Sequence, residues 1–399
     1  VVSHWQQAPS ESHWMDALRS GLQASETGWA LYLHIPFCES LCSFCVCNTV
    51  ITKDSKQAEN YVELLKREFH HYLSQLPELK DRPLRQVHWG GGTPNFLSSA
   101  QIQDLCQSLL GECQIDWSSF EGSVEMDPRR PTKEALEVLS RWGFQRLSLG
   151  VQDLNEPVQR SINRVQPMEQ LQEVFATARN HQYSSINLDF IYGLPRQSED
   201  EFVSSLKRSF ELEPDRIVIY PLALLPQSRS QMKYLDLQTV AQGDEKLEMF
   251  ARGLEVLKNQ GYRHLGLGHH CKPSDPLFVS EQQGRLHKNF TGFTSQGSSV
   301  LLGLGVSAIS EAPSILHQNE KVLPIYARKI QNSELATFRG HLLSDRDQRI
   351  QKVIFEFMTK KSVSEFDLQA LGVESDAWQP FIQRGLVEWA DSKLKVTQP

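Results

Sequence analysis

The sequence predicts an α/β protein organised as a partial, TIM-like (β/α)6 barrel. Six short apolar or alternating segments lie between residues 29 and 226, and stretches with helical periodicity separate them. This alternation is typical of parallel strands joined by right-handed crossovers. In addition, cysteine, glycine and carboxylate residues directly follow successive strands, at the end where parallel barrels carry their active sites.

The predicted elements follow an N-terminal arm in regular order. The arm, residues 1–28, carries one short helix near Trp14–Leu22. The strands are predicted at Ala30–Ile35, Gln86–Trp89, Gly122–Met126, Arg146–Gly150, Ile186–Ile191 and Arg216–Tyr220. The helices between them are predicted at Ala58–Leu73, Ser98–Leu110, Thr132–Trp142, Pro167–Asn180 and Glu199–Leu212.

The C-terminal part predicts a small, mainly helical domain. Helices are expected at Asp345–Lys360, Ser364–Leu371 and Trp378–Arg384, followed by a ribbon at Leu386–Val396. The pattern is similar to a winged helix, but its charge is not notably basic, so a lid or packing role is expected rather than DNA binding. The predicted division is an arm at 1–28, a barrel with its extension at 29–310, and a linker with the small domain at 311–399.

The composition describes a soluble globular chain. The 399 residues are 40% hydrophobic and 22% charged, with a net charge of -7. No apolar run approaches the roughly 20 residues that cross a bilayer, and the acidic balance argues against a broad nucleic-acid surface. No secretory or transit segment is visible and the thiols are clustered, so a cytoplasmic location is expected. Because the sequence begins at Val1 without methionine, we expect it to be a trimmed form of a longer natural one.

Four of the seven cysteines lie within the ten residues from Cys38 to Cys47. Cys38, Cys42 and Cys45 are spaced x3 and then x2, so a short loop can turn their sulfurs toward three irons of a cubane cluster. The fourth iron then has no cysteine ligand and can hold a substrate or cofactor. Cys47 is not expected to be a ligand, because it would close that position.

Three other interpretations of these cysteines compete with a cluster. Structural zinc prefers two well separated ligand pairs, and no second C-x2-C or H-x3-5-H pair follows downstream. A disulfide framework suits small secreted chains, whereas this chain is long and has an odd number of cysteines. Chance clustering of buried cysteines fits poorly as well, because Pro36, Glu39, Ser40 and Ser43 mark the segment as a loop.

The residues after the other strands suggest a ligand site. Gly90, Gly91 and Gly92 let the main chain approach a ligand closely, although the same residues are expected in a tight turn. Glu125 at a strand end can accept hydrogen bonds from hydroxyl or ammonium groups, unless it is a plain surface charge. Asp189 and the pair that begins at Gln152 also follow strands.

The cysteine stretch resembles the signature of radical S-adenosylmethionine (SAM) enzymes, and specifically the oxygen-independent coproporphyrinogen III oxidase family. The resemblance rests on Tyr32-x-His34-Ile35-Pro36-Phe37-Cys38-x3-Cys42-x-Phe44-Cys45-x-Cys47-Asn48 and on the tract Gly150–Gln166. Cys47 points to this family, since the related haem-chaperone branch usually has an aromatic residue at that position.

The resemblance implies a [4Fe-4S] cluster held by Cys38, Cys42 and Cys45, and two molecules of SAM. It implies that the SAM sites are lined by Tyr32, Phe44, Gly91, Gly92, Thr93, Glu125, Gln152, Arg164, Asp189, Ala223 and Ile309. No catalytic side chain is expected beyond these ligands.

The reaction implied by the resemblance begins with a 5'-deoxyadenosyl radical that removes hydrogen from a propionate β carbon of coproporphyrinogen III. Loss of CO2 and one electron leaves a vinyl group, and two such reactions give protoporphyrinogen IX in haem biosynthesis. The expected partners are this substrate and an electron-donor protein, and the chain is expected to be a monomer.

A substrate with four carboxylates requires cations, and part of the family pattern is altered. The candidate cations are Arg129, Arg130, Arg160, Arg164, Arg196, Lys272, Arg285 and Lys288. Gly268 stands where the family usually has aspartate, and His270-Cys271 stand in place of Phe-Ala. His269, His270 and Cys271 could mimic a metal site, but adjacent residues rarely ligate one ion. A haem chaperone and a radical SAM enzyme that transfers a methyl or methylene group remain alternatives.

Overall fold

A computed structural model describes residues 5, 8–24, 27–130 and 132–397. Within these residues, one mixed sheet of 12 strands has the order β16-β15-β14-β13-β1-β4-β5-β6-β7-β8-β10-β9. Its centre is formed by the six predicted strands, which pair in parallel and in sequence order. They are β1 (Trp29–Ile35), β4 (Leu84–Gly91), β5 (Glu121–Met126), β6 (Phe144–Gln152), β7 (Ser185–Tyr192) and β8 (Arg216–Pro221). The protein therefore has an α/β fold with a large, mainly parallel central sheet.

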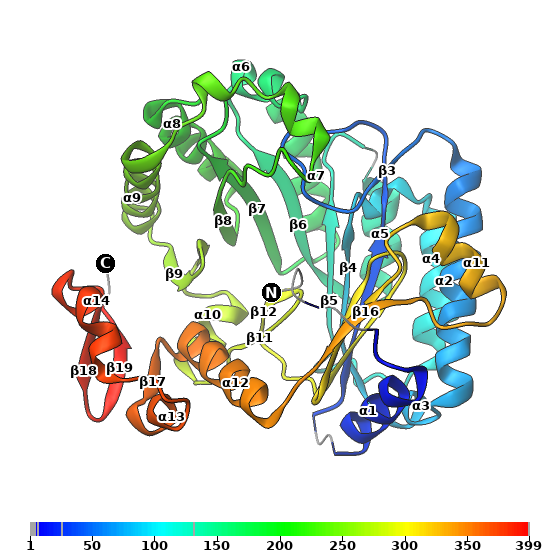
Figure 1. Cartoon of the computed structure of the whole chain (residues 1–399). Coiled ribbons are helices and arrows are strands. Elements are labelled where there is room, and N and C mark those ends of the chain that lie inside the picture. The colour runs from blue at the N-terminus through cyan, green and yellow to red at the C-terminus, as the bar shows by residue number, and fades with distance from the viewer. Residues whose placement is uncertain (1–4, 6–7, 25–26, 131, 398–399) are drawn as a thin grey trace.

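The predicted helices are present and lie along the outer side of this sheet (Figure 1). Ser98 and Ser198 cap two of them with capping boxes. In each, the serine hydroxyl accepts a hydrogen bond from the main-chain amide three residues later, and the side chain of that later residue accepts one from the serine amide. The predicted helices are α1 (Glu11–Ala24), α2 (Ser55–Gln75), α4 (Ser99–Leu109), α5 (Lys133–Arg141), α7 (Met168–Asn180) and α8 (Glu199–Ser209). The sequence did not predict α9 (Gly243–Asn259), which packs beside α8.

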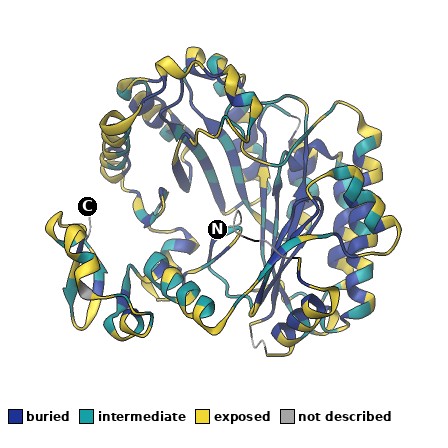
Figure 2. Cartoon of the chain, viewed as in Figure 1, coloured by how far each residue is buried: buried dark blue, intermediate teal, exposed yellow. Residues whose placement is uncertain are grey.

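Strand alternation separates the two faces of the central sheet. Val87, Val124, Leu147 and Leu188 are at most 1% exposed and belong to the main core. The residues between them are largely polar and face the opposite side, as the period of two in a strand requires. Figure 2 shows buried strands behind helices whose outer surfaces are exposed.

Both edges of the sheet carry strands that the sequence did not predict; β13 pairs with β1 in parallel, and the others pair with their neighbours in antiparallel. On the β1 side are β13 (Val300–Leu304), β14 (Ile309–Ala312), β15 (Ile315–Asn319) and β16 (Thr337–Leu342), and on the β8 side are β10 (His269–Cys271) and β9 (Arg263–Gly266). The boundary predicted after residue 310 falls inside β14. The segment expected as a linker thus contributes strands to the large sheet.

Shorter elements complete the chain. They are β2 (Phe37–Cys38), β3 (Val50–Ile51), α3 (Glu78–Asp81), α6 (Glu156–Ser161), α10 (Pro276–Gln282), β11 (His287–Asn289), β12 (Gly292–Thr294) and α11 (Leu323–Gln331). Among the described helices, none has the length and apolar character that crossing a membrane requires. Residues 1–4, 6, 7, 25 and 26 of the predicted arm lie outside the described residues.

Residues 345–397 pack as a small unit with its own core. Its helices are α12 (Asp345–Lys360), α13 (Glu365–Ala370) and α14 (Gln379–Gln383), and its three-stranded sheet has the order β17 (Ser362–Ser364), β19 (Lys393–Val396), β18 (Val387–Ala390). Val363, Leu368, Val387 and Leu394 form the core. The three helices and the ribbon were predicted, and β17 adds a strand to them.

A buried carboxylate joins α2 to the antiparallel extension. Glu68 is 1% exposed. Its carboxylate accepts hydrogen bonds from Gly305 N (2.8 Å), Asn319 Nδ2 (2.7 Å) and Tyr326 Oη (2.7 Å). Burial raises the pKa of Glu68 to about 7, and the three donors offset this only in part.

Replacing Glu68 with Gln should remove a pH-dependent contribution to stability. The folded pKa of about 7 exceeds the ordinary value of 4.5, so between these values the folded state keeps a proton that the unfolded chain releases. The wild type therefore loses stability as the pH rises through this window. The free energy of unfolding of the wild type relative to Glu68→Gln should fall by about 3 kcal/mol, measured by urea unfolding of the apoprotein from pH 4.5 to 7.5.

The control is Glu63→Gln on the same helix, whose side chain is 59% exposed. It should follow the wild type across the whole range. A wild type that holds a constant difference from Glu68→Gln between pH 4.5 and 7 would contradict the titration of Glu68.

Candidate functional site

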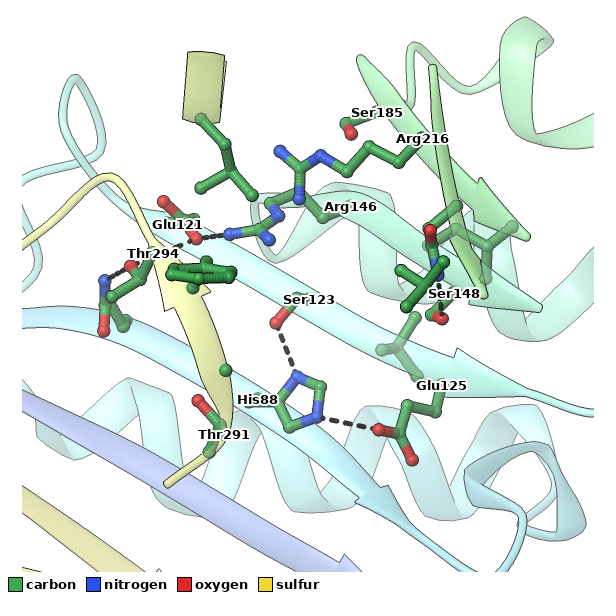
Figure 3. A pocket seen from close by; sticks show the side chains of 18 of the residues that line it. His88, Glu121, Ser123, Glu125, Arg146, Ser148, Ser185, Arg216, Thr291 and Thr294 are labelled. Atoms are coloured by element: carbon green, nitrogen blue, oxygen red, sulfur yellow. Dashed lines mark hydrogen bonds and ion pairs between the residues drawn. The ribbon is translucent and has the colours of Figure 1, made fainter. Parts of the chain in front are cut away.

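The polar face of the central strands lines a cavity. Its empty space amounts to about 890 Å³, including the part open to solvent. The polar lining comes from alternate strand residues, including His88, Glu121, Ser123, Glu125, Arg146, Ser148, Asn187, Asp189, Arg216 and Tyr220. Figure 3 shows several of these side chains pointing inward from neighbouring strands.

The three predicted cluster ligands lie on the loop after β1, beside the ends of β4 and β5. The Cys38 thiol is 3.3 Å from the Thr93 hydroxyl. Burial, together with the nearby thiols of Cys45 and Cys42, raises the pKa of Cys38 to about 11, although the Thr93 hydrogen bond acts in the opposite direction. The three sulfurs are thus close enough to influence one another.

Cations face these sulfurs. Arg164 Nη1 and Arg129 Nη2 point at Cys42 Sγ at 3.5 and 3.8 Å. A hydrogen bond with Cys47 lowers the pKa of Cys45 below the usual range, with Arg229 and Arg164 as further causes. Guanidinium groups beside thiols favour the thiolate, which is the form that binds iron.

The cysteine loop fits an iron–sulfur cluster. Within the described part of the chain, no three His, Cys, Asp or Glu side chains converge as a single ion would require. In a cubane each cysteine binds a different iron, so three neighbouring but separate thiols are what such a group needs. Cys38, Cys42 and Cys45 provide these donors.

Glu125 stands at the centre of a hydrogen-bonded group. It accepts from Gly91 N (3.3 Å) and pairs with His88 Nε2 (3.3 Å), whose other nitrogen contacts Ser123 Oγ (2.7 Å). The His88 ring stacks on Tyr32 with centroids 5.8 Å apart. Burial alone would raise the pKa of Glu125, but the hydrogen bond and charge of His88 outweigh it and lower the pKa. Glu125 is therefore an ionised acceptor at the cavity wall.

The glycines beside Glu125 leave no room for side chains. A Cβ on Gly90 would lie 2.8 Å from Glu125 Oε2, and one on Gly92 would lie 2.6 Å from the carbonyl oxygen of Pro36. Gly91 has φ +112°, a conformation that glycine adopts without strain. The main chain of β4 therefore runs directly against the cysteine loop and Glu125, so the turn and the close approach are both present.

Arg164 ties the strand ends to the cysteine loop. Its guanidinium binds Asp127 Oδ2 (3.1 Å) and the carbonyl oxygen of Gly150 (2.6 Å) in addition to Cys42. Burial would raise the pKa of Asp127, but Arg164 and Arg129 bring it to about 2. Gln152, two residues after Gly150 on β6, has a φ of 70°, which is uncommon for a residue other than glycine. Asp127 is thus a permanent anion that holds two arginines.

Asp189 behaves differently from Asp127. It accepts from Ser148 Oγ and Asn187 Nδ2, both at 2.9 Å. Burial, with the negative charge of Glu125 as a smaller cause, raises its pKa to about 6 against these hydrogen bonds. The cavity wall thus pairs one ionised carboxylate, Glu125, with one that titrates near neutral pH.

The remaining predicted ligand residues lie around this centre. Phe44 is partly buried on the cysteine loop, and Ile309 is 5% exposed in β14. Ala223 is exposed in the segment after β8. That segment contacts the cysteine loop, because Gln231 Nε2 donates to the carbonyl oxygen of Cys45 (2.6 Å) and Arg229 donates to that of Val46.

The predicted substrate cations separate into two groups. Arg129 and Arg164 face Cys42, and Lys288 is near Glu311, whereas Arg130 pairs with Glu39. None of these four is among the residues that line the cavity, and neither are the other predicted cations, Arg160, Arg196, Lys272 and Arg285. His269 faces the cavity and His270 stacks on His264, so the neighbouring histidines diverge.

Sequence reasoning missed His88, Arg146 and Arg216. All three occupy inward positions on strands, upstream of the strand ends. The signal that could have found them is the alternation of polar and apolar residues within the predicted strands.

Comparisons with known proteins agree with one another. The family model of the radical SAM superfamily matches residues 32–208. The oxygen-independent coproporphyrinogen III oxidase of Escherichia coli strain K12 is 36% identical over 383 residues, covering 92% of this chain and 82% of that protein. The protein of the same name from Pseudomonas aeruginosa is 34% identical over 394 residues, covering 96% and 85%.

A solved structure is similar over nearly the whole chain. The structure of coproporphyrinogen III oxidase from Escherichia coli, described as a radical SAM enzyme, has a TM-score of 0.89 and 33% sequence identity with this chain. The similarity covers 99% of this chain and 94% of that one.

Substitution of Cys38, Cys42 or Cys45 by Ala should abolish a reconstituted cluster, because each thiolate is expected to hold its own iron. The measurement is iron and sulfide content together with visible absorbance after anaerobic reconstitution. Cys47→Ala, in the same loop, and Cys106→Ala, which is fully buried on α4, are matched controls expected to keep the cluster. Full cluster absorbance in any of the first three variants would overturn the ligand assignment.

Proposed function

The chain belongs to the oxygen-independent coproporphyrinogen III oxidase family of the radical SAM superfamily, and from this premise we propose that it converts coproporphyrinogen III to protoporphyrinogen IX. Two propionate side chains would each lose CO2, a hydrogen atom and an electron to become vinyl groups. The observation that carries the proposal is the meeting of the cysteine loop with Gly91, Glu125 and Arg164 at the strand ends.

The proposed cofactors are a [4Fe-4S] cluster held by Cys38, Cys42 and Cys45, and SAM. When bound and reduced, the cluster with SAM supplies a 5'-deoxyadenosyl radical able to take a hydrogen atom from an unactivated carbon. An electron-donor protein is the proposed source of the reducing electron. The protein's own task is to bind, orient and exclude water.

We propose that one SAM lies along the end of β4. The main chain of Gly91 and Gly92 and the side chain of Thr93 would hold its amino acid end, and the ionised Glu125 would accept from its ribose hydroxyls. The His88 contact supports this role, because it keeps Glu125 charged and oriented. Tyr32 would pack on the cofactor, held by its stacking on His88.

A second SAM is proposed to bind in the same region. Phe44, Gln152, Arg164, Asp189, Ala223 and Ile309 would help to line the two SAM sites. The contacts of Arg229 and Gln231 with the cysteine loop support a role of the segment after β8 as a cover.

The proposed function also assigns roles to the central sheet and to the small C-terminal unit. We propose that the central sheet and its outer helices act as the partial (β/α)6 barrel expected from the sequence, with its catalytic end at the cysteine loop. The unit that begins near α12 would serve as a packing or lid domain.

An anaerobic assay of the reconstituted protein with SAM, a reductant and coproporphyrinogen III should yield 5'-deoxyadenosine and protoporphyrinogen IX. Mass spectrometry of both products is the measurement, and the Cys38→Ala protein is the control. Deoxyadenosine without loss of CO2 would point to another substrate, such as that of a methyl- or methylene-transferring enzyme. Neither product, with tight haem binding instead, would favour a haem chaperone.

Glu125→Gln should selectively weaken the binding of SAM. The substitution keeps the shape of the side chain but removes the charged carboxylate that would accept hydrogen bonds from the ribose hydroxyls. The KM for SAM is expected to rise about tenfold, equivalent to about 1.4 kcal/mol, with a smaller change in kcat. Initial rates of 5'-deoxyadenosine formation provide the test. Glu134→Gln on the surface of α5 should match the wild type, and an unchanged KM in Glu125→Gln would refute this role.

A further inference from the structure

Two arginines lie next to each other in the cavity, toward the beginnings of the strands. Arg146 comes from β6 and Arg216 from β8, and Figure 3 shows their guanidinium groups converging beside Glu121 and Ser185. Burial lowers the pKa of Arg146, and the positive charge of Arg216 lowers it further. Burial and the charge of Arg216 also lower the pKa of His269 to about 3. This end of the cavity is therefore electropositive.

The ion pairs of the two arginines leave donors unused. Arg146 pairs with Glu121, and Arg216 Nε donates to Asp275 Oδ2 at 2.7 Å. Arg146 Nε and Arg216 Nη2 are buried and have no hydrogen-bond partner among the described residues. A buried charged donor without an acceptor costs more free energy than a neutral one. An acceptor in the cavity would therefore be favoured beside these two donors.

The two nearby acids already have other donors. Asp275 also accepts from Ser185 Oγ (2.8 Å) and from Leu277 N (2.9 Å). Glu121 also accepts from Ser295 Oγ (2.5 Å). A ligand in the cavity can supply the acceptor. A carboxylate suits the site, because its two oxygens accept from a guanidinium fork and its charge relieves the repulsion between two cations.

We propose that Arg146 and Arg216 bind a propionate carboxylate of the tetrapyrrole that is not the one reacting. This inference rests on the proposed function and specifies how its substrate is held. The two arginines set the depth and orientation of the macrocycle in the cavity, with a reacting propionate at the cofactor end.

The spacing along the strands agrees with this arrangement. Arg146 pairs in register with Ser123, two residues before Glu125 on β5, and Glu121 lies two residues further back. At about 3.3 Å per residue, the backbone of Arg146 lies roughly 7 Å below that of Glu125 along the strands. A ligand that reaches both ends has to be elongated or broad, as a macrocycle with propionates on several rings is.

A purely structural role would make a different prediction. The pair of Arg216 with Asp275 joins β8 to the start of α10, and that of Arg146 with Glu121 joins β6 to β5. If the arginines served only this purpose, their removal would lower stability without any dependence on the number of carboxylates in a ligand. The test therefore compares ligands that differ in that number.

The experiment measures equilibrium binding of coproporphyrin III, with four charged propionates, and of its tetramethyl ester, with none, to the reconstituted protein by fluorescence quenching. Arg146→Gln and Arg216→Gln should each raise the Kd for coproporphyrin III at least tenfold and that for the tetramethyl ester much less. Arg146→Lys should recover part of the affinity. In turnover, KM for coproporphyrinogen III should rise with a smaller change in kcat.

The matched control is Arg179→Gln, which removes an arginine–aspartate pair on the outer side of the sheet, where Arg179 Nη2 and Asp215 Oδ2 are 2.7 Å apart. It should bind both porphyrins like the wild type. Circular dichroism and thermal unfolding verify that each variant is folded. If a Gln variant does not fold, Arg146→Lys replaces it in the binding measurements. Unchanged coproporphyrin affinity in folded variants, or an equal loss for both porphyrins, would overturn the proposal.

Binding separates this inference from the proposed function. Arginine-dependent coproporphyrin binding without protoporphyrinogen formation would support the carboxylate site and refute the oxidase activity. Turnover that persists with wild-type KM in both Gln variants would support the activity and refute the site.

Discussion

The buried ion pair between Arg164 and Asp127 is the interaction on which the geometry of the site depends. One guanidinium binds the carboxylate of Asp127, the main chain of Gly150 and the sulfur of Cys42. Both charged side chains are only 9% exposed. Removing Asp127 would leave the buried charge of Arg164 without its acid, which costs on the order of 3–5 kcal/mol. The ends of β5 and β6 are thus fixed to the cysteine loop by the protein alone.

Much of the fold could be predicted because its signals are local. The apolar periodicity of α2 and the capping serines Ser98 and Ser198 lie within single elements, and the six parallel strands follow one another in sequence order. The antiparallel extension could not be predicted in this way. The extension is joined to α2 by the buried carboxylate of Glu68. This carboxylate binds Gly305 and Asn319, which are 237 and 251 residues away in the chain. Periodicity identifies an element but not its distant partner.

The residues of the candidate site also differ in whether local sequence signals could predict them. Cys38, Gly91 and Glu125 follow strands directly, so the rule that parallel strands gather function at their carboxyl ends was enough to group them. Arg146 and Arg216 stand near the other ends of their strands. A polar residue within a strand usually faces solvent, and only the arrangement of β4 to β8, with the β11–β12 hairpin beside them, turns this face into a cavity wall. Their importance is a property of the assembled sheet.

The cavity has carboxylates toward one end and arginines toward the other, and this distribution determines which ligand groups are favoured at each end. Glu125 is ionised and Asp189 titrates near pH 6 at the cysteine-loop end, whereas Arg146 and Arg216 lie at the other. Charges separated by about 10 Å in a poorly screened interior still interact appreciably. A sulfonium or ammonium group is therefore favoured beside the carboxylates, and the several carboxylates of an acidic ligand are favoured beside the arginines. Since one such ligand must also present a carboxylate-bearing arm near Glu125, a cation bound there first reduces the repulsion that the arm would meet.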